Sequence, residues 1–432
     1  MIKKIMFILA IALVASITAA AYAEVQNVKV GGDIYVIGIN RYRFDLMKHD
    51  TTTNNTHNGD LWGTVSRVRI DADLTDNVST TVRVLNERVW STLGEDAANS
   101  DIDLDLALVT LKEFLFEPVT LVVGRQPIKL GDGLLVADPY TNQTGSAASS
   151  FPTGFKGLSQ RRAFDGIVAV LDYAPVRVTG GFVKGLSGYT DLADNNADAD
   201  VYALNVIAKD PILTITPELT YVLKDIKKTV NGAGQVSNYS IRLSAAPVKD
   251  LKARGEFVYQ TQKNSVARPD RTHMGDTAIT AGVDYVLSEV KMQPSFGADY
   301  MRLSQNWDRM YESIVTGDII NGLFANTNQQ VIGINIGMKP TDDFTVKLRY
   351  ANARAVKAYD DATLLVWGST AACYDMTDKK DLGNEFDVNL FYDYTEDVQF
   401  GFKVGLFNPG KAFDGNNDSY ASQVVGTMKV TF

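Results

Sequence analysis

The feature that most constrains this chain is a repeated alternation of apolar and polar residues in short segments. The connections between the segments are by turns tight and long. The tight ones carry turn residues, at Asp76-Asn77, Glu117-Pro118, Ala174-Pro175, Asp210-Pro211, Pro247 to Asp250, Ser288-Glu289, Thr341 to Asp343 and Thr395 to Asp397. Longer polar stretches lie between them, at 45–60, 127–162, 304–328 and 357–383. Short turns at one end and long loops at the other are typical of a transmembrane β-barrel.

The period-2 segments predict about eighteen strands of roughly ten residues, the length that a tilted membrane strand needs. Alternation is cleanest in 332–338, 344–350, 386–394 and 398–406. In 29–44, Tyr35, Ile37 and Ile39 share a phase with Arg41 and Arg43, so we expect a break or a bulge there. Segment 103–116 changes phase near Val109. We predict an all-β fold, an antiparallel transmembrane barrel formed as one domain by residues 24–432, with short periplasmic turns and long extracellular loops.

The aromatic residues also fit a membrane. Many lie near predicted strand ends, where girdles form at the two interfaces: Tyr42, Phe44, Trp90, Phe114, Phe116, Tyr392 and Tyr394. An ordinary aromatic core is the alternative. The chain ends at Phe432, on the strand face of Val430 and Met428. We expect the outer-membrane assembly machinery to recognise Phe432, and the last strand to close against the first.

Residues 1–23 have the pattern of a secretory signal peptide. Lys3 and Lys4 precede an apolar stretch from Ile5 to Ile17, and Ala21-Tyr22-Ala23 forms a small-x-small cleavage site before Glu24. A transmembrane anchor is the alternative, but the stretch falls short of the ~20 residues that a spanning helix needs. We therefore expect cleavage near Ala23-Glu24 and residence in the bacterial outer membrane, in contact with its lipid.

Composition argues against several other classes of protein. The formal charge of −9 argues against nucleic acid as a partner. The single cysteine, Cys373, excludes an intramolecular disulfide and a multi-cysteine metal site. The three histidines form no Ser/His/Asp arrangement and no metal-binding spacing, so we expect neither an enzyme nor a cofactor. The acidic runs Asp191 to Asp200 and Asp414 to Asp418 lack the spacing of a calcium loop, and solvated loop charge is the preferred interpretation.

Basic residues fall on the strand phase that should face the lumen, because an arginine facing mid-membrane lipid costs ~2–4 kcal/mol. This set is Arg67, Arg69, Arg83, Arg177, Arg242, Lys252, Arg254, Lys347 and Arg349. Acids share the phase at Asp71, Asp73, Glu87, Glu256, Asp299, Asp387 and Asp393. The arginines could pass an anionic solute between them, because the guanidinium group binds carboxylates bidentately. The alternative is a structural ladder in which each arginine pairs with an acid.

A local motif surrounds the long connection at 127–162. Gly124-Arg125-Gln126 ends one strand, Leu130-Gly131-Asp132-Gly133-Leu134-Leu135 follows, and Gln160-Arg161-Arg162-Ala163-Phe164-Asp165-Gly166 opens the next strand. This pattern resembles the alginate export family of outer-membrane porins, although Leu134 stands where that family often has arginine. The resemblance implies an eighteen-stranded barrel with an arginine-lined pore for an acidic polysaccharide. It also adds Arg125, Arg161 and Arg162 to the expected pore lining.

The long connection could fold inward and narrow the pore, or rest outside as a cap. The function expected from the sequence is passive conduction of an anionic solute or polysaccharide. Two alternatives are a general-diffusion porin with little charge preference and a surface-attached or soluble all-β binding protein. The sequence does not distinguish the solute, the direction of transport or the oligomeric state.

Overall fold

The computed structural model describes residues 27–47, 59–90, 102–139, 158–186, 198–226, 234–265, 268–359, 363–365, 373–415 and 417–432. Nearly all of them belong to strands or to the connections between strands. No helix in these ranges is long and apolar enough to cross a membrane.

Eighteen strands form a single sheet. They are β1 (Asn27–Tyr42), β2 (Gly59–Thr75), β3 (Val78–Val89), β4 (Asp103–Leu111), β5 (Val119–Pro127), β6 (Ala163–Tyr173), β7 (Val176–Leu186), β8 (Asp198–Ala208), β9 (Ile215–Ile226), β10 (Gly234–Ala245), β11 (Leu251–Ser265), β12 (Arg268–Val286), β13 (Ser295–Leu303), β14 (Gln329–Thr341), β15 (Phe344–Ala355), β18 (Asp381–Asp393), β19 (Val398–Pro409) and β20 (Ala421–Thr431). Two short strands, β16 (Thr363–Leu365) and β17 (Cys373–Asp375), pair with each other between β15 and β18, and α2 spans Ile320–Leu323. Cys373 therefore lies on a short strand.

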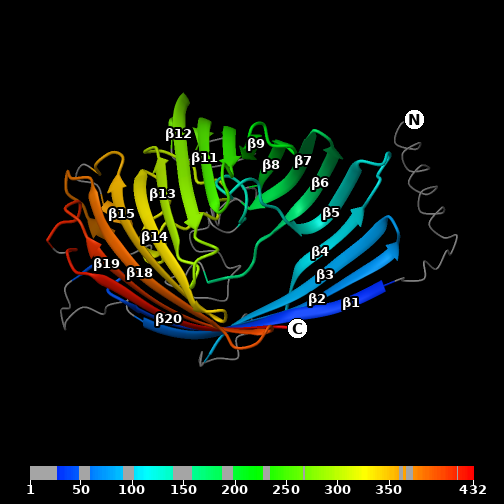
Figure 1. The fold of residues 1–432 in the computed structure, drawn as a ribbon. Helices are drawn as coiled ribbons and strands as arrows, with labels where there is room; N and C mark the ends of the chain where they lie inside the picture. The colour runs from blue at the N-terminus through cyan, green and yellow to red at the C-terminus, as the bar shows by residue number, and fades with distance from the viewer. Residues whose placement is uncertain are drawn as a thin grey trace.

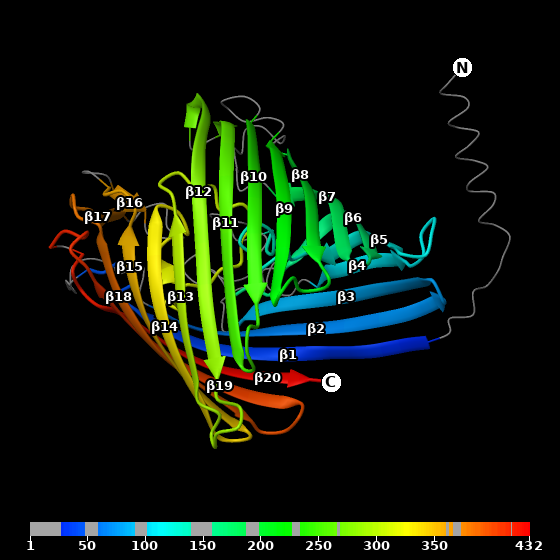
Figure 2. The ribbon, with the colours of Figure 1, turned by 45° about the horizontal axis from the view of Figure 1, so that its top comes forward.

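Each barrel strand pairs antiparallel with the next barrel strand along the chain, β15 with β18 included, and β20 pairs with β1, so the sheet closes on itself. Figures 1 and 2 show the strands following one another around the barrel in chain order. The predicted fold class and strand number are confirmed. The barrel strands run from 9 residues in β4 to 19 in β12. The longest strands therefore exceed the expected length of roughly ten residues. β11 ends at Ser265 and β12 begins at Arg268.

The connections 76–77, 112–118, 174–175, 209–214, 246–250, 287–294, 342–343 and 394–397 join consecutive strands at one end of the barrel, here called the turn end. The connections from β1 to β2, β5 to β6, β13 to β14 and β15 to β18 leave from the other end, which is called the loop end. Successive connections lie at alternate ends of the barrel because every neighbouring pair of strands is antiparallel.

The outward phase of the strands is a continuous apolar belt. On β14, Ile332, Ile334 and Ile336 are 47%, 51% and 42% exposed, and Phe400 and Phe402 on β19 are similar. Aromatic rings border the belt toward both ends. Tyr221 lies 5.2 Å from Tyr239 toward the loop end, and Tyr394 lies 6.2 Å from Phe400 toward the turn end. This exterior suits hydrocarbon bordered by two interfaces. Phe44 is an exception among the expected girdle residues, because it is buried inside the barrel.

The structure resolves both irregular phases. β1 contains no bulge against β2: Tyr35, Ile37, Ile39 and Arg41 all face inward in continuous register. The expected break does not occur because Ile37 and Ile39 pack inside the barrel with neighbouring apolar side chains. In β4 the register shifts where Arg83 and Val84 of β3 meet Leu106 and Leu104, a bulge at Asp105, which is earlier than the expected change near Val109.

Candidate functional site

Two connections from the loop end turn back into the barrel. We call residues 128–139 the first inward segment and residues 304–328 the second inward segment. Asp132 of the first accepts a hydrogen bond from Arg242 of β10 at 2.8 Å and lies 3.7 Å from Arg254 of β11. Leu134, at the position where the resembling family often has arginine, is 1% exposed and packs in the core cluster inside the barrel. The described part of the 127–162 connection thus folds inward.

The second inward segment is fixed to the wall by polar contacts along its length. Asp308 pairs with Lys224 of β9 at 2.7 Å, and its backbone exchanges hydrogen bonds of 2.8 and 2.9 Å with the Gln260 side chain of β11. Burial alone would raise the pKa of Asp308, but the Lys224 ammonium and the Met310 N–H outweigh it and hold that pKa below its usual value. Asp308 is therefore a charged anchor.

Farther around the barrel, β15 and β18 hold the end of the second inward segment that carries α2. The Arg349 guanidinium donates two hydrogen bonds to the Thr316 carbonyl and pairs with Asp299 at 2.6 Å. The Glu385 carboxylate accepts hydrogen bonds from the Ile319 and Ile320 amides at 2.6 and 2.7 Å. The segment thus spans the lumen between distant strands.

The two inward segments also bind each other. The Ala137 and Asp138 amides donate to the Tyr311 carbonyl at 2.7 and 2.9 Å, and the Tyr311 amide donates to the Leu135 carbonyl at 3.0 Å. Around this junction lies an apolar cluster with inward residues of the wall such as Val201, Val222 and Val258. Burial of this apolar surface holds both segments inside the barrel.

A gap of about 250 Å³ remains between the second inward segment and the wall formed by β1, β19 and β20. Tyr35, Ile37 and Ile39 form an apolar side of the gap, and Asn321 and Asp318 lie on the segment side. Its cations are Arg41, whose Nε donates to Gln423 at 2.8 Å, and Lys403, which lies 3.7 Å from Asp318. The narrowed lumen is the candidate functional site.

Most of the basic residues expected in the lumen do face inward, and most are paired with acids. Arg67 binds Asp33 bidentately, Arg69 binds Asp71, Arg83 binds Asp105, Arg161 binds Glu87 and Asp103, Arg162 lies 3.2 Å from Asp138, Arg177 binds Asp172, Arg242 binds Glu218 and Asp132, Arg254 binds Asp284, and Arg349 binds Asp299. Lys347 lies over the Phe391 ring at 5.7 Å. These contacts are those of the charge-ladder alternative.

Arg125 has a different position from the one expected. It pairs in register with Asp165 and donates to that carboxylate at 2.7 Å. The neighbouring pair Val123 and Ile167 is on the same outward face and is exposed, whereas the adjacent Phe164 is buried inside against Tyr311. Arg125 is therefore on the outside of the barrel. The motif did not show which face of the barrel carries Arg125, because Gly124 and Arg125 still belong to β5 and precede the inward segment that starts at residue 128.

The gap is lined by residues that the sequence did not single out. Lys403 shares the clean inward phase of β19 and could have been found from it. Arg41 shares a phase with Tyr35, Ile37 and Ile39, and the sequence therefore predicted a break or a bulge there and not a lumen position for Arg41. Asp318 lies in a connection without a period. Nothing in the local sequence shows that 304–328 enters the barrel, because the contacts that bring it in come from strands elsewhere in the chain.

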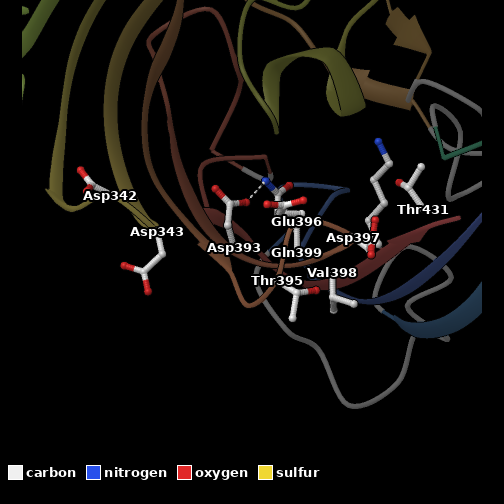
Figure 3. A pocket seen from close by; sticks show the side chains of 10 residues that line it. Asp342, Asp343, Asp393, Thr395, Glu396, Asp397, Val398, Gln399 and Thr431 are labelled. Carbon is white, nitrogen blue, oxygen red and sulfur yellow. Dashed lines mark hydrogen bonds between the residues drawn. The ribbon is translucent and has the colours of Figure 1, made fainter.

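A second hollow, of about 720 Å³, opens at the turn end (Figure 3). Five carboxylate side chains line it, those of Asp342, Asp343, Asp393, Glu396 and Asp397, together with Lys429. Asp393 accepts a hydrogen bond from Gln399 at 2.7 Å, drawn as a dashed line in Figure 3. No group of acidic, histidine or cysteine side chains in the described ranges could hold a metal ion. The acidic hollow gives the turn-end mouth a negative rim.

Comparison with known proteins identifies the fold. No protein-family model and no curated protein matches the chain. Among solved structures, it is similar to Pseudomonas aeruginosa OccK8 (OprE), with 10% identity and a TM-score of 0.60 over 94% of this chain and 99% of that one. P. aeruginosa OccK11 (OpdR) matches with 12% identity and a TM-score of 0.58, over 94% and 97%. Acinetobacter baumannii OccAB4 matches with 10% and 0.57, over 95% and 100%. At these identities the similarity establishes a shared barrel fold.

Proposed function

We propose that this protein is a passive channel of the outer membrane that conducts small hydrophilic solutes through a constricted lumen. The observation that carries the proposal is the closed barrel with an apolar exterior and a lumen narrowed by two inward segments to a charged gap. The barrel fold that this chain shares with OccK8, OccK11 and OccAB4 supports it. A closed barrel is also the arrangement of strands that leaves no backbone group unpaired in hydrocarbon.

The finer proposal is a weak preference for anions. Arg41 and Lys403 line the gap together with one acid, Asp318, so cations outnumber acids in the lining of this gap. The preference is weak because the other inward arginines are neutralised by paired acids and because carboxylates rim the turn-end mouth. An acidic polysaccharide of the alginate type stays a prediction from the family resemblance, and the small size of the gap favours a smaller anion.

The general-diffusion alternative keeps a specific observation in its favour, the near-complete pairing of the lumen arginines. The two possibilities differ in the zero-current potential of single channels under a KCl gradient. We expect the zero-current potential to have the sign of an anion-selective channel. Its magnitude should be well below the value for a channel that passes anions alone. A potential of zero would establish the general-diffusion alternative, and one of cation sign would refute the anion preference. Absence of any conductance from folded, heat-modifiable protein would refute the channel itself.

A further inference from the structure

The outer face of β2 and β3 carries a polar pocket beside the apolar belt. In the outward phase, Val68 and Ile70 of β2 and Val82 of β3 are exposed apolar residues toward the turn end. Toward the loop end the same phase becomes polar, with Ser66 paired to Asn86 and Thr64 paired to Arg88. These four residues and Trp90 line a hollow of about 400 Å³. It lies outside the lumen, so the proposed channel makes no use of it.

A tryptophan stack closes the loop-end side of this pocket. The rings of Trp62 and Trp90 lie 5.7 Å apart at an interplanar angle of 20°, and the Trp90 Nε1 donates to the Thr64 hydroxyl at 2.8 Å. Both rings are about half exposed, at 52% and 46%. Exposed tryptophans on a membrane barrel lie at the level of the lipid headgroups. The pocket is therefore at the boundary between the apolar belt and the interface.

The charge in the pocket is unbalanced. Arg88 is exposed and makes no ion pair within the described part of the chain. Elsewhere on the outer face toward the loop end, Arg125 pairs with Asp165 and Lys184 pairs with Asp200. Arg302 of β13 and Arg354 of β15 resemble Arg88 in having no acidic partner within the described residues. Arg88 differs from them in lining a hollow with hydroxyl and amide side chains and a tryptophan. An outward arginine costs least at the interface and gains there from an anionic partner. The guanidinium group with hydroxyl and amide neighbours is suited to phosphate oxygens.

We propose that this pocket binds the phosphate-bearing headgroup of a lipid in the outer leaflet, with Arg88 supplying the charge and Asn86, Ser66 and Thr64 the surrounding polar groups. The tryptophan stack flanks the headgroup, and Val68 and Val82 contact the acyl chains below it. This inference rests on the proposed outer-membrane location. In that leaflet the partner is a phosphorylated glycolipid.

The test is native mass spectrometry of the purified protein, titrated in detergent with a bisphosphorylated lipid A, with phosphatidylcholine or with inorganic phosphate. The variants are Arg88→Gln and, as a matched control, Arg302→Gln, which removes an outward arginine at the loop end of β13. We expect wild type and Arg302→Gln to retain lipid A in preference to phosphatidylcholine. Arg88→Gln should bind lipid A about tenfold more weakly, the loss expected for one charge-assisted hydrogen bond.

Equal weakening by the two variants, or no weakening by either, would overturn the proposal. If inorganic phosphate displaced lipid A at an equal concentration, the ligand of this pocket would be a free anion and the lipid proposal would be overturned. A loss of dimers or trimers in Arg88→Gln would show instead that this face joins two copies of the chain. If Arg88→Gln does not fold, Asn86→Ala should show a smaller, selective loss. Conductance of the same preparations separates the two proposals, because a conducting wild type that ignores lipid A refutes only the lipid site.

Discussion

Arg349 of β15 and Thr316 of the second inward segment are joined by two hydrogen bonds, both from the guanidinium group to one backbone carbonyl, at 3.1 and 2.8 Å. The same guanidinium pairs with Asp299, so its position is set by the wall and its contact with the segment is structural. An arginine that the sequence assigned to solute passage thus positions the constriction.

Replacement of Arg349 by alanine should loosen the second inward segment. The change leaves the Thr316 carbonyl and the Asp299 carboxylate without their donor, a loss of about 1–3 kcal/mol in local stability. We expect a larger and noisier single-channel conductance while the barrel remains folded. Arg69→Ala is the control, because its pair with Asp71 is exposed and contributes about 0–1 kcal/mol. Unchanged conductance in Arg349→Ala would show that other contacts suffice to hold the segment.

Reversal of charge at Lys403 should shift ion selectivity toward cations. A unit charge at 4 Å contributes about 1 kcal/mol even at the dielectric constant of bulk water, and more in a narrow lumen. Lys403→Glu should therefore change the permeability ratio of Cl⁻ to K⁺ several-fold, as read from the zero-current potential. Arg125→Glu provides the comparison, because Arg125 is on the outer face. Equal shifts in the two variants would mean that the gap beside Lys403 is not the ion path.

Glu312 should make the stability of the second inward segment fall as pH rises through the neutral range. Burial raises the pKa of this carboxyl to about 8, assisted by Asp308 and opposed by Arg309 and Asn326. Because the folded pKa lies above the unfolded value, the native state binds more protons, and stability falls as pH rises from about 4.5 through about 8. We expect proteolysis within 304–328 to accelerate between about pH 5 and 8 in wild type and to level off above that range, and to stay constant in Glu312→Gln. A steeper pH response in the glutamine variant would contradict this origin.

Phe432 should be required for efficient assembly. Its amide and carbonyl exchange hydrogen bonds with Gly32 at 3.0 and 2.8 Å. Its ring also fills the space that a side chain on Gly32 would need, 2.7 Å from the site of a Cβ atom. We expect deletion of Phe432 to lower the yield of folded, heat-modifiable barrel in outer-membrane fractions, with Phe432→Tyr near wild type. Normal yield after the deletion would argue against recognition of this residue.

The turn end should face the periplasm. In a Cys373→Ser background, Lys379→Cys at the loop end should react with an impermeant maleimide on intact cells, and Asn77→Cys in the β2–β3 turn should react only after lysis. Both positions are exposed, so accessibility within the fold does not limit the reaction. Labelling of Asn77→Cys alone on intact cells would invert the orientation.

The barrel was predictable because strand identity is local. In 398–406 and 332–338 the apolar residues fall on one phase, and that phase alone assigns Phe402 and Ile334 to the exterior. The constriction was not predictable in the same way. Ile37 and Ile39 are apolar and would be expected to face lipid. They face inward instead, because they pack against residues from distant segments of the chain. Trp307 and Phe324 lie in a connection with no period, and their burial depends on Gln260 and Glu385 far away in the chain.

The seam between β1 and β20 has a kinetic consequence. It joins residues from opposite ends of the chain, such as Arg41 and Gln423, which are 382 positions apart. Every other pairing in the barrel is between consecutive strands and can form as a growing hairpin array. The seam must wait for the last strand, and contacts of such sequence separation are slow to form. Until then the array has two open edges that can pair with other chains. The lifetime of that open-edged intermediate, and not the stability of the finished barrel, would set how much of the protein is lost to aggregation.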